Sequence, residues 1–274
     1  MPIIDEKGGI LNDPVLLRLA EDHFWLSLAD SDVLLYAKGL AAGHNLDVTV
    51  DEPDVSPLAI QGPRANDVAA ALLGEWVRDL RFFRFKEFNL DGIPLVVARS
   101  GWSKQGGIEL YLRDGRQGVR LWEMVEEAGK PFDIAPATPS TIERIESGLL
   151  SYGNDMTIRE NPYEVGLGAF CDVDQEFDFI GKTALKEILA QGVKRQIVGL
   201  VIDSQRLGGA SHYWPLSQNG EELGYITSAI FSPRLEKNIA LALVPIEYSA
   251  EGTLFTAHTE WGDYAAVVHP VPFG

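Results

Sequence analysis

Hydrophobic and polar residues follow two different periods along the first part of the chain. The mostly apolar run 24–29 is short and is bounded by polar residues, so it predicts a buried strand. Similar short runs predict strands over 58–60, 83–90, 95–99 and 108–112. A period close to that of an α-helix predicts helices over 33–42, 66–73 and 117–128. Ser31 or Asp32 is expected to cap the first of these helices, and Asn66 the second.

The pattern changes towards the C-terminus. Pro-Ser-Thr at 139–141 is expected to start a helix with Ile142, Ile145, Leu149 and Leu150 as its apolar residues, and another helix is predicted over 182–191. The residues between them, 153–173, show little periodicity and are interpreted as an ordered connector. Strands are then predicted over 196–202, 223–231, 239–244, 253–257 and 264–269. The predicted fold class is therefore α+β, with an α+β region over residues 1–173 and a compact β-barrel-like domain over 174–274.

The net charge of the chain limits which classes of binding partner are expected. The 274-residue chain has 40 acidic and 23 basic residues and a formal net charge of −17. Nucleic-acid binding depends on clustered Lys and Arg, so a nucleic-acid partner is not expected. The densest basic stretch, 78–86, also contains Phe82, Phe83 and Phe85 and is interpreted as a solvated face. A small anionic ligand remains compatible with this composition, because a few local bases can dominate a pocket.

Several common types of site are not expected. Cys171 is the only cysteine, which excludes an intrachain disulfide and favours a reducing, cytoplasmic setting. The five histidines are scattered without metal-ligand spacing, so no metal site is predicted. No apolar run reaches the ~18 residues that cross a bilayer, and no signal peptide is recognisable, so no membrane partner is expected. The Gly-rich stretch 101–107 has neither P-loop nor dinucleotide-binding spacing.

A series of short segments along the chain resembles one superfamily. The segments are Gly-Gly-Ile-Leu-Asn-Asp at 8–13, Leu-Ala-Ile-Gln-Gly-Pro at 58–63, Arg-Ile-Glu-Ser-Gly-Leu at 144–149, Tyr-Gly-Asn-Asp at 152–155 and Thr-Ser-Ala-Ile-Phe-Ser-Pro at 227–233. In this order they resemble signatures of the glycine-cleavage T-protein superfamily. Asn-Asp-Pro at 12–14 and the stretch 100–107 are most similar to the dimethylsulfoniopropionate demethylase branch, and Ser140 stands where glycine-cleavage members have an arginine.

The resemblance implies a function. It implies a tetrahydrofolate-dependent methyltransferase with a folate-binding region over 1–173, which transfers a methyl group from a sulfonium such as dimethylsulfoniopropionate to N5 of tetrahydrofolate. A related demethylase or aminomethyltransferase with another donor, and a non-catalytic folate-binding module, are the alternatives. Family members extend before the position of Met1, so a missing N-terminal segment, a homo-oligomer or a second chain that completes the pocket is also compatible with the resemblance.

The resemblance also assigns roles to individual residues. Asp13 is expected near N5 of the folate as the catalytic carboxylate, although an Asn-Asp-Pro turn would also explain it. Glu109 is expected to bind the amino-pyrimidine edge of the pterin, and its alternative is a solvated strand position. Trp102 is expected to stack on the pterin or to hold a sulfonium, unless it is a core aromatic residue. Ser27 and Tyr152 complete the expected folate-binding set. The two carboxylates are expected to line one pterin cavity.

Overall fold

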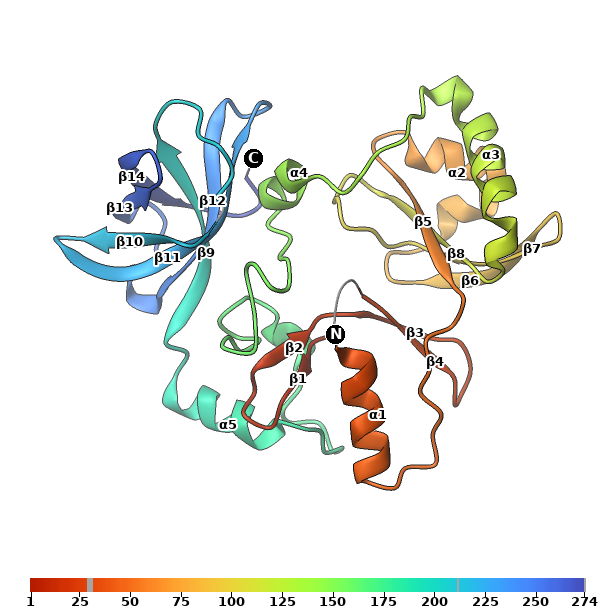
Figure 1. Cartoon of the computed structure of the whole chain (residues 1–274), viewed down its shortest axis with the longest axis horizontal. Helices are drawn as coiled ribbons and strands as arrows, with labels where there is room; N and C mark the ends of the chain where they lie inside the picture. The colour runs from red at the N-terminus through yellow and green to blue at the C-terminus, as the bar shows by residue number, and fades with distance from the viewer. Residues whose placement is uncertain (29–31, 211, 274) are drawn as a thin grey trace. The chain divides into compact units, whose positions relative to one another are not determined.

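The structure, a computed structural model, describes residues 1–28, 32–210 and 212–273 (Figure 1). The chain divides into two compact units, one formed by Ala37–Ser140 and the other by Met1–Tyr36 together with Thr141–Gly274. The predicted α+β class with a C-terminal barrel is confirmed. Within the described parts of the chain, every helix is too short or too polar to cross a membrane.

The unit Ala37–Ser140 is built on a four-stranded antiparallel sheet with the order β5-β8-β7-β6. Its strands are β5 (Ser56–Gln61), β6 (Phe85–Leu90), β7 (Ile93–Ala98) and β8 (Gly107–Leu112). Its helices are α2 (Ala65–Leu73), α3 (Gly118–Gly129) and a short 3-10 turn over Glu75–Asp79, and most of α1 (Val33–Gly43) also belongs to this unit. All four strands and all three α-helices lie within two residues of the predicted bounds.

Helices α2 and α3 cover one face of this sheet. Ile108, Leu110 and Leu112 point to that face and join the buried core with residues of both helices, such as Ala69 and Leu121. Because side chains alternate along a strand, the residues between them on β8 point to the opposite face. One face of the sheet is therefore filled by the core, and only the opposite face is open to a ligand.

The start of helix α2 differs from the prediction. Arg64, and not Asn66, is the N-cap residue, and no side chain caps the helix there. The Asn66 side chain instead accepts a hydrogen bond of 2.7 Å from Nη1 of Arg99. The expected cap was wrong because a tertiary contact uses the asparagine oxygen that would have capped the helix.

The other unit begins with two small antiparallel pairs. Strand β1 (Ile3–Ile4) pairs with β2 (Ile10–Asn12), and β3 (Val15–Arg18) pairs with β4 (Phe24–Ser27). The strand predicted over 24–29 is present as β4, but its predicted burial was wrong, since Phe24 is 48% exposed and β4 belongs to a sheet of two strands. A two-stranded sheet leaves alternate side chains unburied. Residues 29–31, including the predicted cap Ser31, lie outside the described residues.

Helix α4 (Thr141–Glu146) is shorter than predicted. The backbone N–H of Leu149 donates to the carbonyl of Arg144 at 2.8 Å, and Gly148 has a φ of +66°. A glycine in the left-handed region is a common way to end a helix. Leu149 and Leu150 therefore follow the helix, whereas α5 (Lys182–Gln191) has the predicted bounds. The segment between α4 and α5 contains one 3-10 turn, Gly168–Phe170, and otherwise forms the expected connector.

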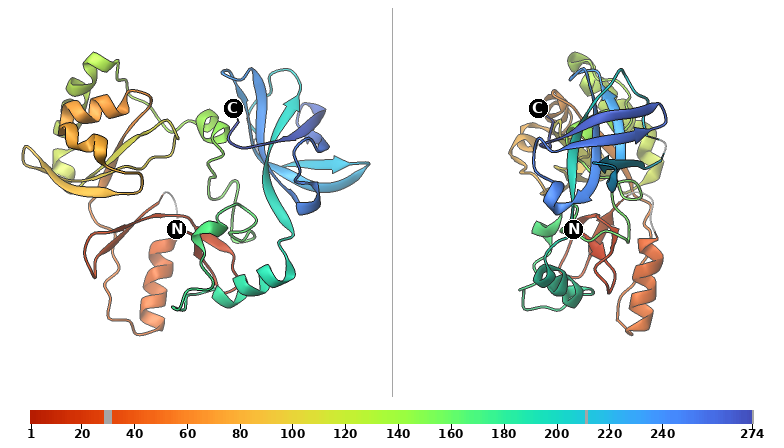
Figure 2. Two further views of the ribbon diagram at one scale, coloured as in Figure 1. Left: turned by 180° about the vertical axis from the view of Figure 1, so that it is seen from behind. Right: turned by 90° about the vertical axis from the view of Figure 1, so that its left-hand side faces the viewer.

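The C-terminal part of this unit is a closed six-stranded barrel with the order β10-β11-β12-β9-β14-β13 (Figure 2). Its strands are β9 (Arg195–Asp203), β10 (Trp214–Gln218), β11 (Glu221–Ser232), β12 (Lys237–Pro245), β13 (Leu254–Thr259) and β14 (Gly262–His269). Trp214, Ile226 and Leu200 are fully buried in its core. Strand β10 was not predicted, because it contains Pro215 and a proline usually argues against a strand.

Candidate functional site

Asp13 lies directly after β2, in the N-terminal part of its unit. Burial raises the pKa of its half-buried carboxyl group to about 6, and this rise is partly offset by the Met1 ammonium and by a backbone N–H. A carboxyl group with this pKa changes its charge close to neutral pH, which general acid–base chemistry requires. Perturbed pKa values cluster at functional sites, so the environment of Asp13 is compatible with the expected role.

Asn12 fixes the backbone at Asp13. Its Oδ1 accepts a hydrogen bond of 2.8 Å from the Asp13 N–H, and its side chain is almost fully buried. Its Nδ2 has no hydrogen-bond partner within the described part of the chain. A buried donor without a partner costs on the order of 1–3 kcal/mol. Asn12 belongs to the Asn-Asp-Pro motif at 12–14 but was not expected as a site residue.

Glu109 points to the face of the sheet opposite helices α2 and α3. Its neighbours on the adjacent strands are Ala59 on β5 and Ala98 on β7, whose short side chains leave room beside the carboxylate. Both Ser100 Oγ and Tyr111 Oη, the latter at 3.3 Å, donate to the same carboxylate oxygen, Oε2. Among the described residues, no hydrogen bond is donated to Oε1. Glu109 is thus a half-buried, oriented acceptor and not a freely solvated strand residue.

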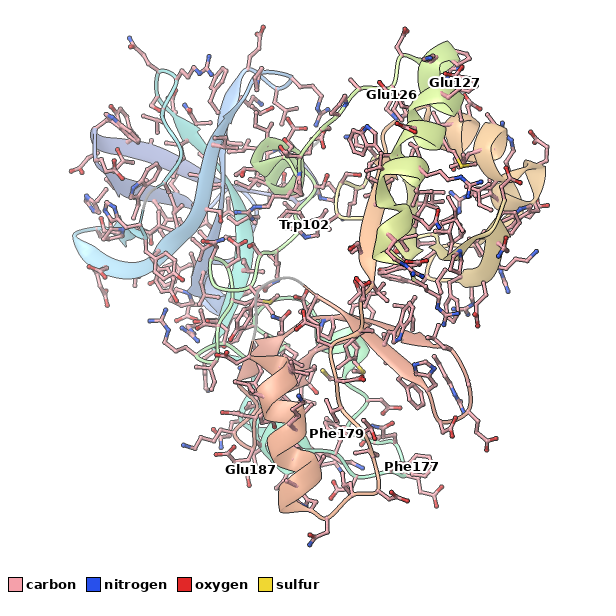
Figure 3. The ribbon with its side chains drawn as sticks, turned by 45° about the vertical axis from the view of Figure 1, so that its right-hand side comes forward. Trp102, Glu126, Glu127, Phe177, Phe179 and Glu187 are labelled. Atoms are coloured by element: carbon pink, nitrogen blue, oxygen red, sulfur yellow. The ribbon has the colours of Figure 1, made fainter. Side chains whose placement is uncertain are left out.

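A glycine-rich loop joins β7 to β8 beside Glu109. Trp102 lies on this loop and is 41% exposed, which does not fit a core aromatic residue (Figure 3). The side chain of Gln61, at the end of β5, bonds to the loop at Ser100 and Ser103. Neither Gln61 nor Ser100 was expected as a site residue, although both stand within the quoted family-like segments.

Ser27 and Tyr152 lie in the same unit as Asp13. Ser27 ends β4 and pairs with Val15 on β3, which follows Asp13 along the chain. Tyr152 begins the connector and forms an isolated bridge with Met156. Burial and the nearby carboxylate of Asp32 raise the pKa of Tyr152, so its hydroxyl group stays protonated at neutral pH and can donate a hydrogen bond. Their assignment to folate binding stays a prediction.

Asp13 and Glu109 belong to different compact units. The expected shared cavity therefore stays a prediction. Within its own unit, each of the two carboxylates is half-buried and has surroundings compatible with binding a polar ligand.

Three family-like segments meet in one buried polar network. Arg144 Nη1 lies 2.7 Å from Asp155 Oδ2, and Arg144 Nη2 lies 2.7 Å from Ser228 Oγ. Thr227 and Ser228 each donate to Asp155 Oδ1 at 2.6 Å. A buried network in which both charges are paired stabilises the fold, which supports a structural role for Arg144.

Other chemistry receives less support. Ser217, His258 and Asp263 form a hydrogen-bonded chain on the barrel, with distances of 2.8 Å at both ends of the imidazole. The His258 and Asp263 side chains are 38% and 66% exposed, so water competes for both hydrogen bonds. Cys171 is half-buried, and burial raises the pKa of its thiol, which disfavours the nucleophilic thiolate. The described residues contain no cluster of His, Cys, Asp and Glu suited to a metal ion.

Family comparisons agree with the order of the two regions. The GCVT N-terminal domain model matches residues 1–175, and the glycine cleavage T-protein C-terminal barrel domain model matches residues 195–273. The second match contains all six strands of the closed barrel. Together the two models cover most of the chain.

Individual relatives fall into two named groups. The chain is 48% identical over 262 residues to dimethylsulfoniopropionate demethylase DmdA of Ruegeria pomeroyi, an alignment that covers 96% of this chain and 71% of the relative. It is 33% identical over 257 residues to an aminomethyltransferase of Desulfitobacterium hafniense, covering 92% and 69%. The crystal structure of glycine cleavage system aminomethyltransferase T from Bartonella henselae superposes with a TM-score of 0.82 at 26% identity, over 100% of this chain and 74% of that one.

Proposed function

This chain belongs to the glycine cleavage T-protein family, and from this we propose that it transfers a methyl group from a sulfonium donor to tetrahydrofolate. The chain is an enzyme of a tetrahydrofolate-dependent family, as the short motifs predicted. The observation that carries the choice of donor is the 48% identity to dimethylsulfoniopropionate demethylase DmdA. The proposed donor is dimethylsulfoniopropionate or a sulfonium of the same chemistry.

The proposed reaction needs no covalent enzyme intermediate. The bond between the methyl carbon and sulfur breaks, its electron pair stays on sulfur as a neutral thioether, and a bond from that carbon to nitrogen forms. Tetrahydrofolate, when bound, would supply N5 as the methyl acceptor, and the N5 proton would pass to the Asp13 carboxylate, directly or through water. Because a sulfonium is already a good leaving group, the protein has to align donor and acceptor and to exclude water.

We assign Asp13 to the nitrogen that accepts the methyl group. Its carboxylate would accept the N5–H hydrogen bond, directly or through water, and would stabilise the positive charge that develops as the new bond forms. The pKa of about 6 supports this role, because the carboxylate is mostly ionised at neutral pH yet basic enough to attract a proton. Asn12 supports the role by holding the backbone of Asp13.

The surroundings of Glu109 fit the amino-pyrimidine edge of a pterin. That edge presents N–H donors, and Oε1 of Glu109 is the carboxylate oxygen that accepts no hydrogen bond from a described residue. Ala59 and Ala98 leave space on the adjacent strands, and Trp102 offers an exposed aromatic face on the neighbouring loop. Ser27 and Tyr152 are proposed as further folate contacts. The folate-binding region is proposed to span residues 1–173 and the barrel domain 174–274.

The proposal is tested with the purified chain, tetrahydrofolate and dimethylsulfoniopropionate. We expect 5-methyltetrahydrofolate and the demethylated thioether to appear in equal amounts, measured by mass spectrometry, and methyl-labelled donor should place the label on the folate. β-Alanine betaine, which has the same propionate chain and a methylated quaternary nitrogen in place of sulfur, is the matched control donor. Tetrahydrofolate binding without methyl transfer from any donor would contradict the proposed enzymatic activity and favour a non-catalytic folate-binding module.

The aminomethyltransferase relatives give a second candidate activity, transfer of an aminomethyl-bound carbon to tetrahydrofolate. Ser140 does not support it, because glycine-cleavage members have an arginine there. An aminomethyl donor in the same assay separates the two activities, since its product is 5,10-methylenetetrahydrofolate and not 5-methyltetrahydrofolate. A homo-oligomer and a cytoplasmic setting stay predictions.

A further inference from the structure

We infer that Gln61 is a positioning residue for folate binding, which acts by holding the loop beside Glu109. The inference rests on the proposed function, in which Glu109 binds the pterin. Gln61 is the last residue of β5 and lies next to the first residue of β8, Gly107, in the sheet. Its own side chain is not proposed to touch the ligand.

Each end of the Gln61 amide group bonds to the loop between β7 and β8. Nε2 donates to the carbonyl oxygens of Ser100 at 3.3 Å and Ile108 at 3.4 Å, on the two sides of the loop. Oε1 accepts a hydrogen bond of 2.7 Å from Ser103 Oγ, and the Ser103 hydroxyl in turn accepts one from the N–H of Gln105. The Gln61 side chain therefore links the start, the middle and the end of the loop by hydrogen bonds.

Two glycines make room for this side chain. A Cβ atom on Gly101 would lie 2.2 Å from Gln61 Oε1, and one on Gly107 would lie 2.7 Å from Gln61 Nε2. Both distances are far shorter than a nonbonded contact allows. Gly101 therefore allows the close approach of Gln61, whereas a Cβ on Gly107 would lie even closer to the backbone carbonyl oxygen of Ile60, at 2.2 Å. Both glycines also have a positive φ, +153° and +145°, which a residue with a side chain rarely adopts.

The contacts connect Gln61 to Glu109. Ser100, whose carbonyl oxygen accepts from Gln61, uses its hydroxyl group to donate to Glu109 Oε2. Ile108, whose carbonyl oxygen accepts from the same amide, directly precedes Glu109. Loss of the Gln61 amide would release both neighbours and leave the Glu109 carboxylate less fixed, with its Oε1 no longer presented in one direction. Trp102, which lies between Ser100 and Ser103, would move with the loop.

The test compares Gln61→Met, which keeps the length of the side chain but removes both polar ends, with Gln196→Met, which changes an exposed glutamine on β9. Tetrahydrofolate is titrated into each protein by calorimetry. We expect Gln61→Met to weaken tetrahydrofolate affinity by roughly tenfold, as when a hydrogen bond to a charged group is weakened. Gln196→Met should bind like the parent protein.

A double-mutant cycle separates positioning from a general loss of structure. If Gln61 acts through Glu109, Gln61→Met should weaken binding in the parent protein and have little further effect in a Glu109→Gln background. Equal effects in both backgrounds would overturn the inference. Ser103→Ala removes one contact of the network and gives the same test, with a smaller expected loss, should Gln61→Met fail to fold.

A spectroscopic signal tests the contact between Gln61 and the loop without the use of folate. With 5-fluorotryptophan incorporated, the fluorine resonance of Trp102, assigned by Trp102→Phe, should shift or broaden in Gln61→Met and stay unchanged in Gln196→Met. An unchanged resonance would overturn the role of Gln61 in holding the loop. A shifted resonance in a protein whose parent form binds no tetrahydrofolate would instead contradict the proposed function.

Discussion

Arg144 and Asp155 form an ion pair of 2.7 Å whose two side chains are only 7% and 0% exposed. The pair joins helix α4 to the connector, and Thr227 and Ser228 attach it to strand β11 of the barrel. Two motifs that lie close together in the sequence and a third from the barrel thus share one buried network. Because these segments are also family-like motifs, their similarity to relatives has a structural cause that is separate from catalysis.

Removing one partner of this pair should be costly. Arg144→Met leaves the Asp155 carboxylate buried without its counter-ion, and we expect the free energy of unfolding to fall by about 3–5 kcal/mol. Urea denaturation followed by circular dichroism measures the change. Arg64→Met, which breaks an exposed ion pair with Asp67, is the control and should cost less than about 1 kcal/mol. Similar losses for both variants would show that burial of the Arg144 pair has no energetic consequence.

Replacement of the proposed catalytic carboxylate should affect turnover more than binding. Asp13→Asn keeps the size of the side chain but cannot take up the N5 proton, so kcat for methyl transfer should fall by about 10²–10⁴-fold. The dissociation constant for tetrahydrofolate, measured by calorimetry, should stay close to that of the parent protein. Asp22→Asn changes an exposed aspartate between β3 and β4 and is the control. Unchanged turnover in Asp13→Asn would remove Asp13 from the chemistry.

Much of the fold could be predicted because it depends on local pattern. Strands β6, β7 and β8 and helices α3 and α5 combine clear periodicity with turn residues such as Gly92 and Gly192, and all were predicted within two residues. The prediction errors occur where contacts between residues distant in the sequence determine the local structure. Strand β10 contains Pro215 yet is held by β11 and β13, and the hairpin of β3 and β4 has no third strand to bury Phe24.

The candidate site could be predicted only in part. Asp13 and Glu109 were found by resemblance to family motifs, since a single carboxylate carries no signal in a chain with 40 acidic residues. The partners that orient Glu109 could not be found in that way. Ser100 and Tyr111 become neighbours of its carboxylate through the side-chain geometry of β7 and β8, and Gln61 reaches the loop from β5. Such contacts depend on which strands pair, and the hydrophobic pattern of the sequence does not show this pairing.

The pH dependence of the reaction should reflect Asp13. Burial raises its pKa to about 6, so the carboxylate is protonated below that pH and ionised above it. If the ionised form is required, kcat/KM should rise with pH up to about 6 and then level off, with a tenfold loss for each pH unit below. Rates measured in buffers of constant ionic strength test this. Asp13→Asn should lose the acid limb, and an unchanged limb in this variant would assign the titration to another group.

The same pKa shift should affect stability with the opposite sign. The pKa is about 6 in the folded chain and close to 3.8 when unfolded, so between these values the folded state binds more protons. The stabilisation from this group is therefore present below pH 3.8 and is lost as the pH rises through 6. Asp13→Asn should melt roughly 2 °C or more above the parent protein at pH 8 and together with it at pH 3.5. If Asp13→Asn were less stable than the parent protein at pH 8, burial of the ionised Asp13 carboxylate would not destabilise the folded state.

Trp102 should contribute to folate binding through its exposed ring. Stacking of an aromatic ring on the pterin is worth about 0.5–1.5 kcal/mol, so Trp102→Leu should weaken tetrahydrofolate binding by roughly threefold to tenfold. Trp102→Phe keeps an aromatic face and should recover most of the affinity. Calorimetry gives the folate affinity and steady-state kinetics give KM for the sulfonium donor, which should change little. The reverse result, a raised donor KM with unchanged folate affinity, would assign the indole to the sulfonium cation, because cation–π attraction depends on the ring face in the same way.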